Sequence, residues 1–147
     1  FSLNGANSSF NTSGSSQVAW QWQAGQGTNT TNTDGTRTST VSVNQTAGFS
    51  IVTFTAQSSG SGTVGHGLGA TPGLIISKRY NTTGAWPVWD TVFTNAQYVF
   101  LNANSAVASQ ANYWGTSTPT SITVVETSTS TSLSEKAFMV ASLSSAL

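Results

Sequence analysis

Two apolar runs of β-type residues, separated by a glycine-rich stretch, stand out in the first half of the chain. Residues 49–55 read FSIVTFT, in which β-branched and aromatic residues dominate. Residues 74–77 read LIIS and follow a Thr-Pro-Gly turn signal. Such runs predict strands, whereas the Gly-His-Gly-Leu-Gly segment at residues 65–69 predicts a loop between them. The stretch from Gly48 to Arg79 therefore indicates a β fold.

The same pattern recurs along the rest of the chain. Short strand-like segments alternate with Gly, Asn, Ser and Asp, and no window sustains an apolar 3.6-residue period beyond two turns. Residues 102–110 are expected to form a surface loop. These features predict an all-β fold with little or no helix, either an antiparallel β-sandwich or a jelly-roll-like arrangement. Strands are predicted at residues 17–23, 36–43, 49–55, 73–79, 88–93, 97–101, 121–126 and 136–143.

The two ends of the chain resemble each other in spacing. The segment FSL is followed by an Asn/Ser/Gly loop and then QVAWQW, and near the other end ITV is followed by a Ser/Thr loop and then FMVASL. We interpret both as the closing hairpin of one module type. Residues 1–24 are then the closing strands of a preceding module or an N-terminal extension, and residues 25–147 are a single β-sandwich module.

Charged side chains are scarce, at 5% of residues, and the formal net charge is zero. This argues against nucleic-acid binding, which needs clustered Lys and Arg, and against attachment to an anionic membrane. No run reaches transmembrane length, so membrane insertion is not expected. Ser and Thr together supply 48 of the 147 residues, which indicates an uncharged outer surface that is insensitive to salt. The chain has no cysteine, so stability must come from elsewhere, and self-association is one source.

The single histidine, His66, is the first candidate for chemistry. A general base needs an orienting carboxylate and a nucleophile, and a metal site needs about three protein ligands. The chain offers only Asp34, Asp90, Glu126 and Glu135, which are scattered along the sequence. The flanking glycines are better explained by a backbone that must turn tightly. Asp90 and Glu126 as a glycosidase pair have little support, so we expect no catalytic residues, no metal and no cofactor.

Aromatic residues cluster in two loop-like regions beside Asn, Thr and Gly. Sugar-binding surfaces place aromatic faces against the apolar side of a pyranose, with amides or carboxylates on the hydroxyls. The alternative, which we favour for the tryptophans, is that they anchor the core or a subunit interface. The candidate ligand-binding residues are Tyr80, Asn81, Trp86, Trp89, Asp90, Tyr113 and Trp114.

Six segments carry a family resemblance in their order along the chain. They are VAWQWQAG at residues 18–25, NTDG with TSTVS from residue 32, TAGFSIV at 46–52, TVGHGLG at 63–69, IISKR at 75–79, and YW with TPTS from residue 113. Together they make the chain resemble modules of tail-fibre and other virion-surface proteins of marine tailed bacteriophages. The family usually closes with an aromatic strand, whereas this chain has FMVASL. The resemblance implies a β-rich, non-enzymatic virion component and carries over no catalytic residues.

These observations predict a non-enzymatic structural protein of a bacteriophage virion, a tail-fibre or surface-fibre module that adheres to a host-surface glycan. Its expected location is the virion surface or the extracellular space. Its expected partners are other copies of itself, other virion proteins and a host glycan. A trimer is the first expectation because fibres need coaxial symmetry. Two alternatives are a capsid-decorating (cement) protein and an extracellular filament subunit that assembles by β-strand exchange.

Overall fold

The computed structural model describes residues 14, 16, 18, 21–25, 27–57, 60–111, 113–126 and 135–141 of the 147-residue chain. Every regular element in these residues is a β-strand, and they contain no helix. The predicted all-β fold is confirmed. The strands are β1 (Thr30–Asn32), β2 (Ser39–Asn44), β3 (Phe49–Thr55), β4 (Gly60–Gly65), β5 (Leu74–Arg79), β6 (Pro87–Asp90), β7 (Gln97–Phe100), β8 (Ala108–Ser109), β9 (Trp114–Ser117), β10 (Ser121–Glu126) and β11 (Glu135–Ala141).

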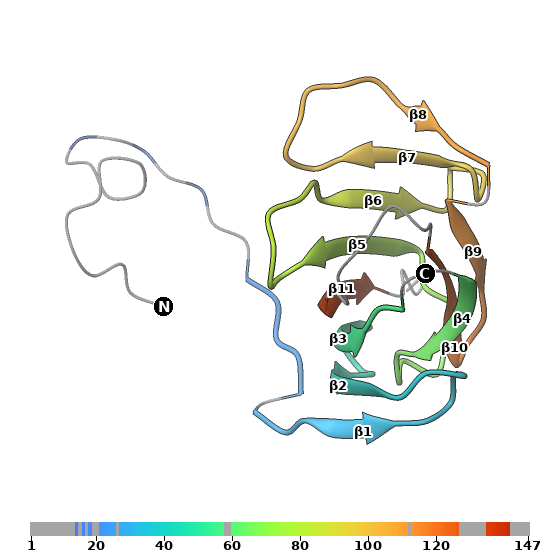
Figure 1. Ribbon diagram of the computed structural model, residues 1–147. Helices are drawn as coiled ribbons and strands as arrows, with labels where there is room; N and C mark the ends of the chain where they lie inside the picture. The colour runs from blue at the N-terminus through green and yellow to red at the C-terminus, as the bar shows by residue number, and fades with distance from the viewer. Residues whose placement is uncertain are drawn as a thin grey trace.

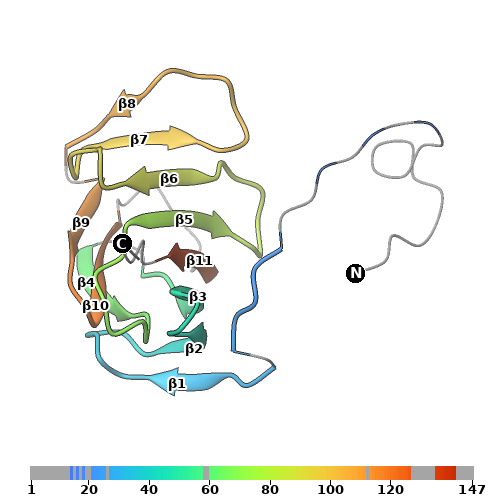
Figure 2. The same cartoon turned by 180° about the vertical axis from the view of Figure 1, so that it is seen from behind.

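The described strands form one large and one small sheet. The large sheet has eight strands in the order β1-β2-β3-β11-β5-β6-β7-β8, and the small sheet has three in the order β4-β10-β9. Neighbouring strands in both sheets run antiparallel. The large sheet extends from β1 at the bottom to β8 at the top of Figure 1, and the small sheet lies to one side, as the view from behind confirms (Figure 2).

The core lies between the two sheets, as expected for a β-sandwich. Alternation along β3 sends Val52 and Phe54 inward, while Ile51 and Thr55 face solvent. The small sheet contributes Val64, Ile122 and Val124 to the same cluster. Apolar side chains of two sheets thus exclude water from each other, which is the main favourable term in folding. The cluster consists of Val41, Val52, Phe54, Val64, Leu68, Ile75, Trp114, Ile122 and Val124.

Strand β11 occupies the centre of the large sheet although it comes last in the chain. It pairs with β3 on one side, from Glu135↔Thr55 to Ala141↔Phe49. On its other side it pairs with β5, from Lys136↔Arg79 to Ala141↔Leu74. Because β3 and β5 are each antiparallel to β11, they run parallel to each other. The last strand therefore joins two halves of the sheet that have no direct pairing in the strand order.

Seven of the eight predicted strands form, and two of them, Phe49–Thr55 and Ser121–Glu126, have the predicted bounds. The other five form with ends shifted by a few residues. The strand predicted at residues 17–23 was wrong for the described part, because Val18 and residues 21–23 lie in no strand. The remainder of the predicted N-terminal unit lies outside the described residues. The surface loop predicted at residues 102–110 is confirmed except for the two residues of β8.

Strand β4 was missed because its sequence, GSGTVG, has little β propensity. Two of its three glycines are required by close contacts. A Cβ at Gly65 would collide with the Asn32 side chain, and one at Gly62 would press on the Arg37 guanidinium. The end of β1 and the connection from β1 to β2, which contains Arg37, therefore pack on β4. The Thr36 and Thr63 hydroxyls each accept a hydrogen bond from the other residue's backbone N–H, both at 2.9 Å.

Two buried serines of the large sheet hydrogen-bond to the chain where β4 ends. The Ser39 hydroxyl of β2 donates to the Gly65 carbonyl at 2.8 Å, and the Ser50 hydroxyl of β3 donates to the His66 carbonyl at 2.7 Å. Both serines are almost completely buried. These two bonds and those of the His66 ring, described below, form a polar seam between the sheets, which we call the serine–histidine seam.

Replacing Ser50 with alanine should destabilise the fold, because it leaves the buried His66 carbonyl without the donor that the Ser50 hydroxyl supplies. We expect the free energy of unfolding to fall by about 1–3 kcal/mol. Denaturant titration of the purified chain measures this change. Ser61→Ala on β4, where the serine is exposed, is the matched control and should stay within about 0.5 kcal/mol of the original chain. Equal midpoints for Ser50→Ala and the original chain would contradict the role of the seam.

Candidate functional site

The structure separates the seven candidate ligand-binding residues into two groups. Tyr80, Asn81 and Trp86 lie in the connection between β5 and β6 and are exposed. Trp89, Asp90, Tyr113 and Trp114 lie further along β6 or at β9, toward the small sheet. In Figures 1 and 2 the β5–β6 and β7–β8 connections lie at one end of the strands of the large sheet, and the small sheet lies toward the opposite end. The seven residues therefore do not form one site.

The two connections, residues 80–86 and 101–107, form a joined exposed surface that we call the loop end. The Trp86 backbone N–H donates to the Asn102 side-chain oxygen at 2.9 Å, and the Leu101 N–H donates to the Trp86 carbonyl at 2.9 Å. Four large apolar side chains are exposed here, at 37% to 60% of their surface. They are Tyr80, Trp86, Leu101 and Val107.

A lysine fixes the Trp86 ring from one side. The Lys78 ammonium nitrogen lies 5.6 Å from the centre of the Trp86 ring, within the range of a cation–π contact. The same ammonium donates to the Gly84 carbonyl at 3.0 Å, which ties it to the β5–β6 connection. The indole is thus positioned while more than a third of its surface stays in solvent. Trp86 is the best-placed aromatic group of the original candidates for contact with a ligand.

The second group of candidates serves the core and a turn. Trp114 is only 7% exposed and belongs to the core cluster, against which Trp89 also packs. Tyr113 stacks on Tyr98, with ring centres 3.8 Å apart, and burial raises the pKa of its phenol. One Asp90 carboxylate oxygen accepts from the Val92 backbone N–H at 3.1 Å, as in a turn. For the two tryptophans, the packing role that we favoured agrees with these positions.

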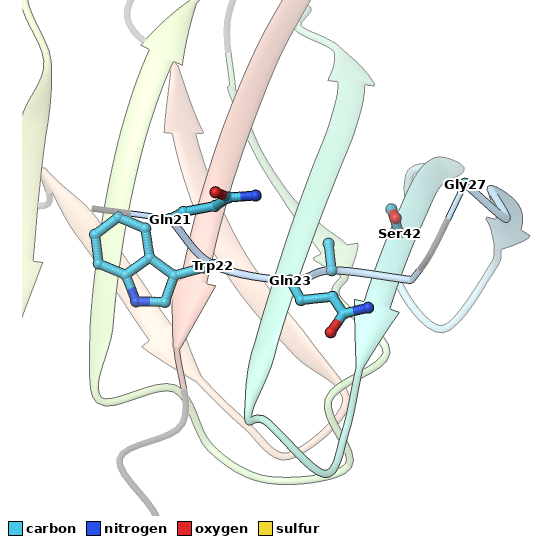
Figure 3. Close-up of a pocket in the computed structure, with 6 residues that line it drawn as sticks. Gln21, Trp22, Gln23, Gly27 and Ser42 are labelled. Atoms are coloured by element: carbon cyan, nitrogen blue, oxygen red, sulfur yellow. The ribbon is translucent and has the colours of Figure 1, made fainter. Parts of the chain in front are cut away.

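A second surface, which sequence reasoning missed, lies where residues 21–25 cross the large sheet (Figure 3). A groove of about 680 Å³ is lined by Gln21, Trp22, Gln23, Ala24, Gly27 and Ser42. Trp22 is 57% exposed. The VAWQWQAG motif could have pointed to this surface, but its alternation of apolar and polar residues was interpreted as a strand. We call this surface the Trp22 groove.

His66 is completely buried, and both of its ring nitrogens have partners within the fold. Nδ1 accepts from the Leu68 backbone N–H at 3.2 Å, so Nε2 carries the proton and donates to the Thr118 carbonyl at 3.1 Å. Gly67 and Gly69 have φ angles of 71° and 73°, which confirms that the glycines serve backbone geometry. The described residues contain no group of three or more His, Cys, Asp or Glu that could hold a metal ion.

Comparison with known protein families gives a match over residues 1–144 to the model described as Domain of unknown function (DUF7483). The chain belongs to the DUF7483 family. Neither the comparison with curated proteins nor that with solved structures gave a match. Among the described residues of this DUF7483 chain, no helix has the length and apolarity needed to cross a membrane.

The environment of His66 makes the stability of this DUF7483 chain depend on pH. Burial lowers the pKa of His66 below its ordinary value of 6.5, and the Thr118 bond opposes this only in part. Protonation would give Nδ1 a hydrogen that faces the Leu68 N–H. Between the folded and unfolded pKa values the unfolded chain binds more protons, so stability rises with pH there. The contribution is fully present above about pH 6.5 and is lost as the pH falls through the folded pKa.

Unfolding midpoints measured between pH 5 and 8 should therefore fall on the acidic side, with a slope of up to about 1.4 kcal/mol per pH unit. His66→Gln should remove this slope, because His66 is the only histidine in the sequence. Ser61→Ala should keep it. A slope that persists unchanged in His66→Gln would show that another group is responsible.

Proposed function

We propose that this DUF7483 chain is a non-enzymatic structural module of a bacteriophage virion, in a tail or surface fibre, that adheres to a host-surface glycan through its loop end. The observation that carries the adhesive part is the exposed Trp86 ring, held in place by Lys78 and by the bonds to residues 101 and 102. The virion part follows from the six sequence segments that resemble phage fibre modules.

The chemistry of the loop end suits an uncharged sugar surface. The apolar side of a pyranose packs on an aromatic face, and its hydroxyls bind amides and other hydroxyls. Trp86 and Tyr80 supply aromatic surface, and Asn81, Thr82 and Thr83 supply exposed polar groups between them. The loop end lies away from the small sheet (Figure 1), and its large apolar side chains are exposed to solvent.

The state of the ionisable groups supports a role without catalysis. The His66 ring is fully used by backbone partners and is closed to solvent. The Asp34 carboxylate accepts from the Asn32 side-chain amide at 3.0 Å, and Asp90 holds the turn after β6.

Truncation of Trp86 tests adhesion. Trp86→Ala should weaken binding of the native assembly to host cells or their isolated surface glycan by about tenfold or more, since aromatic anchors dominate such contacts. Val92→Ala is the control, because Val92 is exposed beyond the far end of β6. Binding would be measured by surface plasmon resonance and folding by the unfolding midpoint. If Trp86→Ala folds and binds like the original chain, the loop end is not the adhesive surface.

The position of β11 favours a second candidate function, a filament subunit that assembles by β-strand exchange. Strand β11 lies between β3 and β5 in the large sheet. Residues 127–134, which separate β10 from β11 in the sequence, are almost all Ser and Thr. A β11 strand from a second copy would make the same backbone hydrogen bonds between β3 and β5.

A disulfide can distinguish the closed from the exchanged arrangement, since the chain has no cysteine of its own. Ile51 and Met139 are direct partners across β3 and β11, a geometry that suits a disulfide. In the double variant Ile51→Cys/Met139→Cys, strand exchange predicts covalent dimers and longer ladders on a non-reducing gel. The Ile51→Cys single variant should give no ladder. Covalently closed monomers alone would contradict the filament candidate.

A further inference from the structure

Residues 21–25 are fastened across the outer face of β2 and β3. The Gly25 backbone N–H donates to the Ser42 hydroxyl at 3.0 Å, and the Asn44 side-chain amide donates to the Gln23 carbonyl at 3.4 Å. Gly25 is needed at this approach, because a Cβ there would lie 3.0 Å from the Val43 backbone nitrogen. The segment is therefore held against the sheet by its backbone, which leaves its side chains available.

Trp22 is held by a ring beneath it. Its indole stacks on the Phe49 ring, with centres 6.1 Å apart and planes inclined by 15°. Phe49 is 5% exposed, whereas Trp22 is 57% exposed. One ring face of the indole thus packs on the protein and most of the remaining surface meets solvent. A tryptophan that served only to cover Phe49 would not need to present so much apolar surface to water.

The groove beside this indole is polar but uncharged. Gln21, Gln23 and Ser42 line it, and none of its six lining residues carries a charge. Residues 1–33 contain no ionisable side chain, so they bring no side-chain charge to the groove. In Figure 3 the side chains of Gln21, Trp22 and Gln23 project from consecutive positions of one short segment. Each glutamine amide offers both a donor and an acceptor.

We propose that the Trp22 groove is a binding site for a neutral saccharide. A pyranose presents an apolar ring face, which matches the open indole, and a rim of hydroxyls, which match the two amides and the Ser42 hydroxyl. The Ser42 oxygen accepts from Gly25, so its own hydrogen remains available for a ligand. The volume of about 680 Å³ lies within the range of small-molecule sites, about 300–1,000 Å³.

Because the residues that line the groove carry no charge, the groove favours an uncharged ligand. A sulfated, sialylated or phosphorylated ligand would lose its hydration without gaining a cationic partner from the lining residues. An acidic or basic peptide would meet the same difficulty. The site does not depend on the loop end, because neither the lining residues nor the bonds that hold them include residues 80–86.

The test uses the full chain and immobilised oligomers of hexose and of N-acetylhexosamine, with sulfated and sialylated oligosaccharides as charged comparators. We expect binding to at least one neutral oligomer and no gain from added negative charge. Trp22→Ala should weaken that binding by about tenfold, and Trp22→Phe, which keeps an aromatic face, should weaken it less. The double variant Gln21→Ala/Gln23→Ala should also weaken it, which provides a second test if Trp22→Ala fails to fold.

The position of the bound saccharide can be identified from the NMR signals of the tryptophan side chains. In a two-dimensional nitrogen–proton spectrum, the Trp22 indole signal is the one that disappears in Trp22→Phe. Added saccharide should shift it and leave the signal of the buried Trp114 in place. Binding that Trp86→Ala abolishes and Trp22→Ala leaves unchanged would support the loop end and overturn the groove. Failure of the chain to bind any neutral oligomer would overturn the groove as well.

Discussion

The serine–histidine seam is the constraint on which the arrangement of the two sheets depends. At the point where β4 ends, the Gly65 and His66 carbonyls are buried, and a buried carbonyl without a donor costs about 1–3 kcal/mol. Ser39 and Ser50 supply these donors from the inner face of the large sheet. The imidazole then ties the same point to Thr118 ahead of β10. Hydrophobic packing brings the sheets together without direction, whereas these hydrogen bonds specify how they are aligned.

The same two strands that carry the seam also carry the Trp22 groove on their opposite face. Side chains alternate across a strand, so Ser50 points into the seam while its neighbour Phe49 supports Trp22. On β2, Ser39 points inward and Ser42 receives the bond from Gly25 on the outer face. A surface built on strands that are anchored from behind is rigid, and rigidity lowers the cost of ordering a site when a ligand binds.

The sequence predicted the strands that are stabilised by bulky apolar side chains. It missed β4, which forms because its glycines allow close contact with neighbouring residues. Phe49–Thr55 has high β propensity, so its alternation was sufficient. Gly60–Gly65 has low propensity and forms because its glycines admit Asn32 and Arg37, which are distant in sequence. The positions of Trp86 and Trp114 could not be predicted for a related reason. Neither the Gly-Ala-Trp-Pro run around Trp86 nor the Tyr-Trp-Gly run around Trp114 shows an alternation that separates inward from outward side chains. Trp114 is buried in the core, and its strand β9 pairs with β10.

Both candidate surfaces use tryptophan and uncharged polar groups, and this follows from the composition. A chain with only eight charged side chains cannot build an electrostatic recognition surface, so selectivity must come from shape, stacking and amide hydrogen bonds. Such contacts change little with ionic strength, unlike those of charged surfaces. Each contact on an open surface is weak, yet copies joined in one assembly convert weak binding into firm attachment. Low charge and exposed indoles are therefore compatible with the proposal that this chain self-associates and holds an uncharged surface.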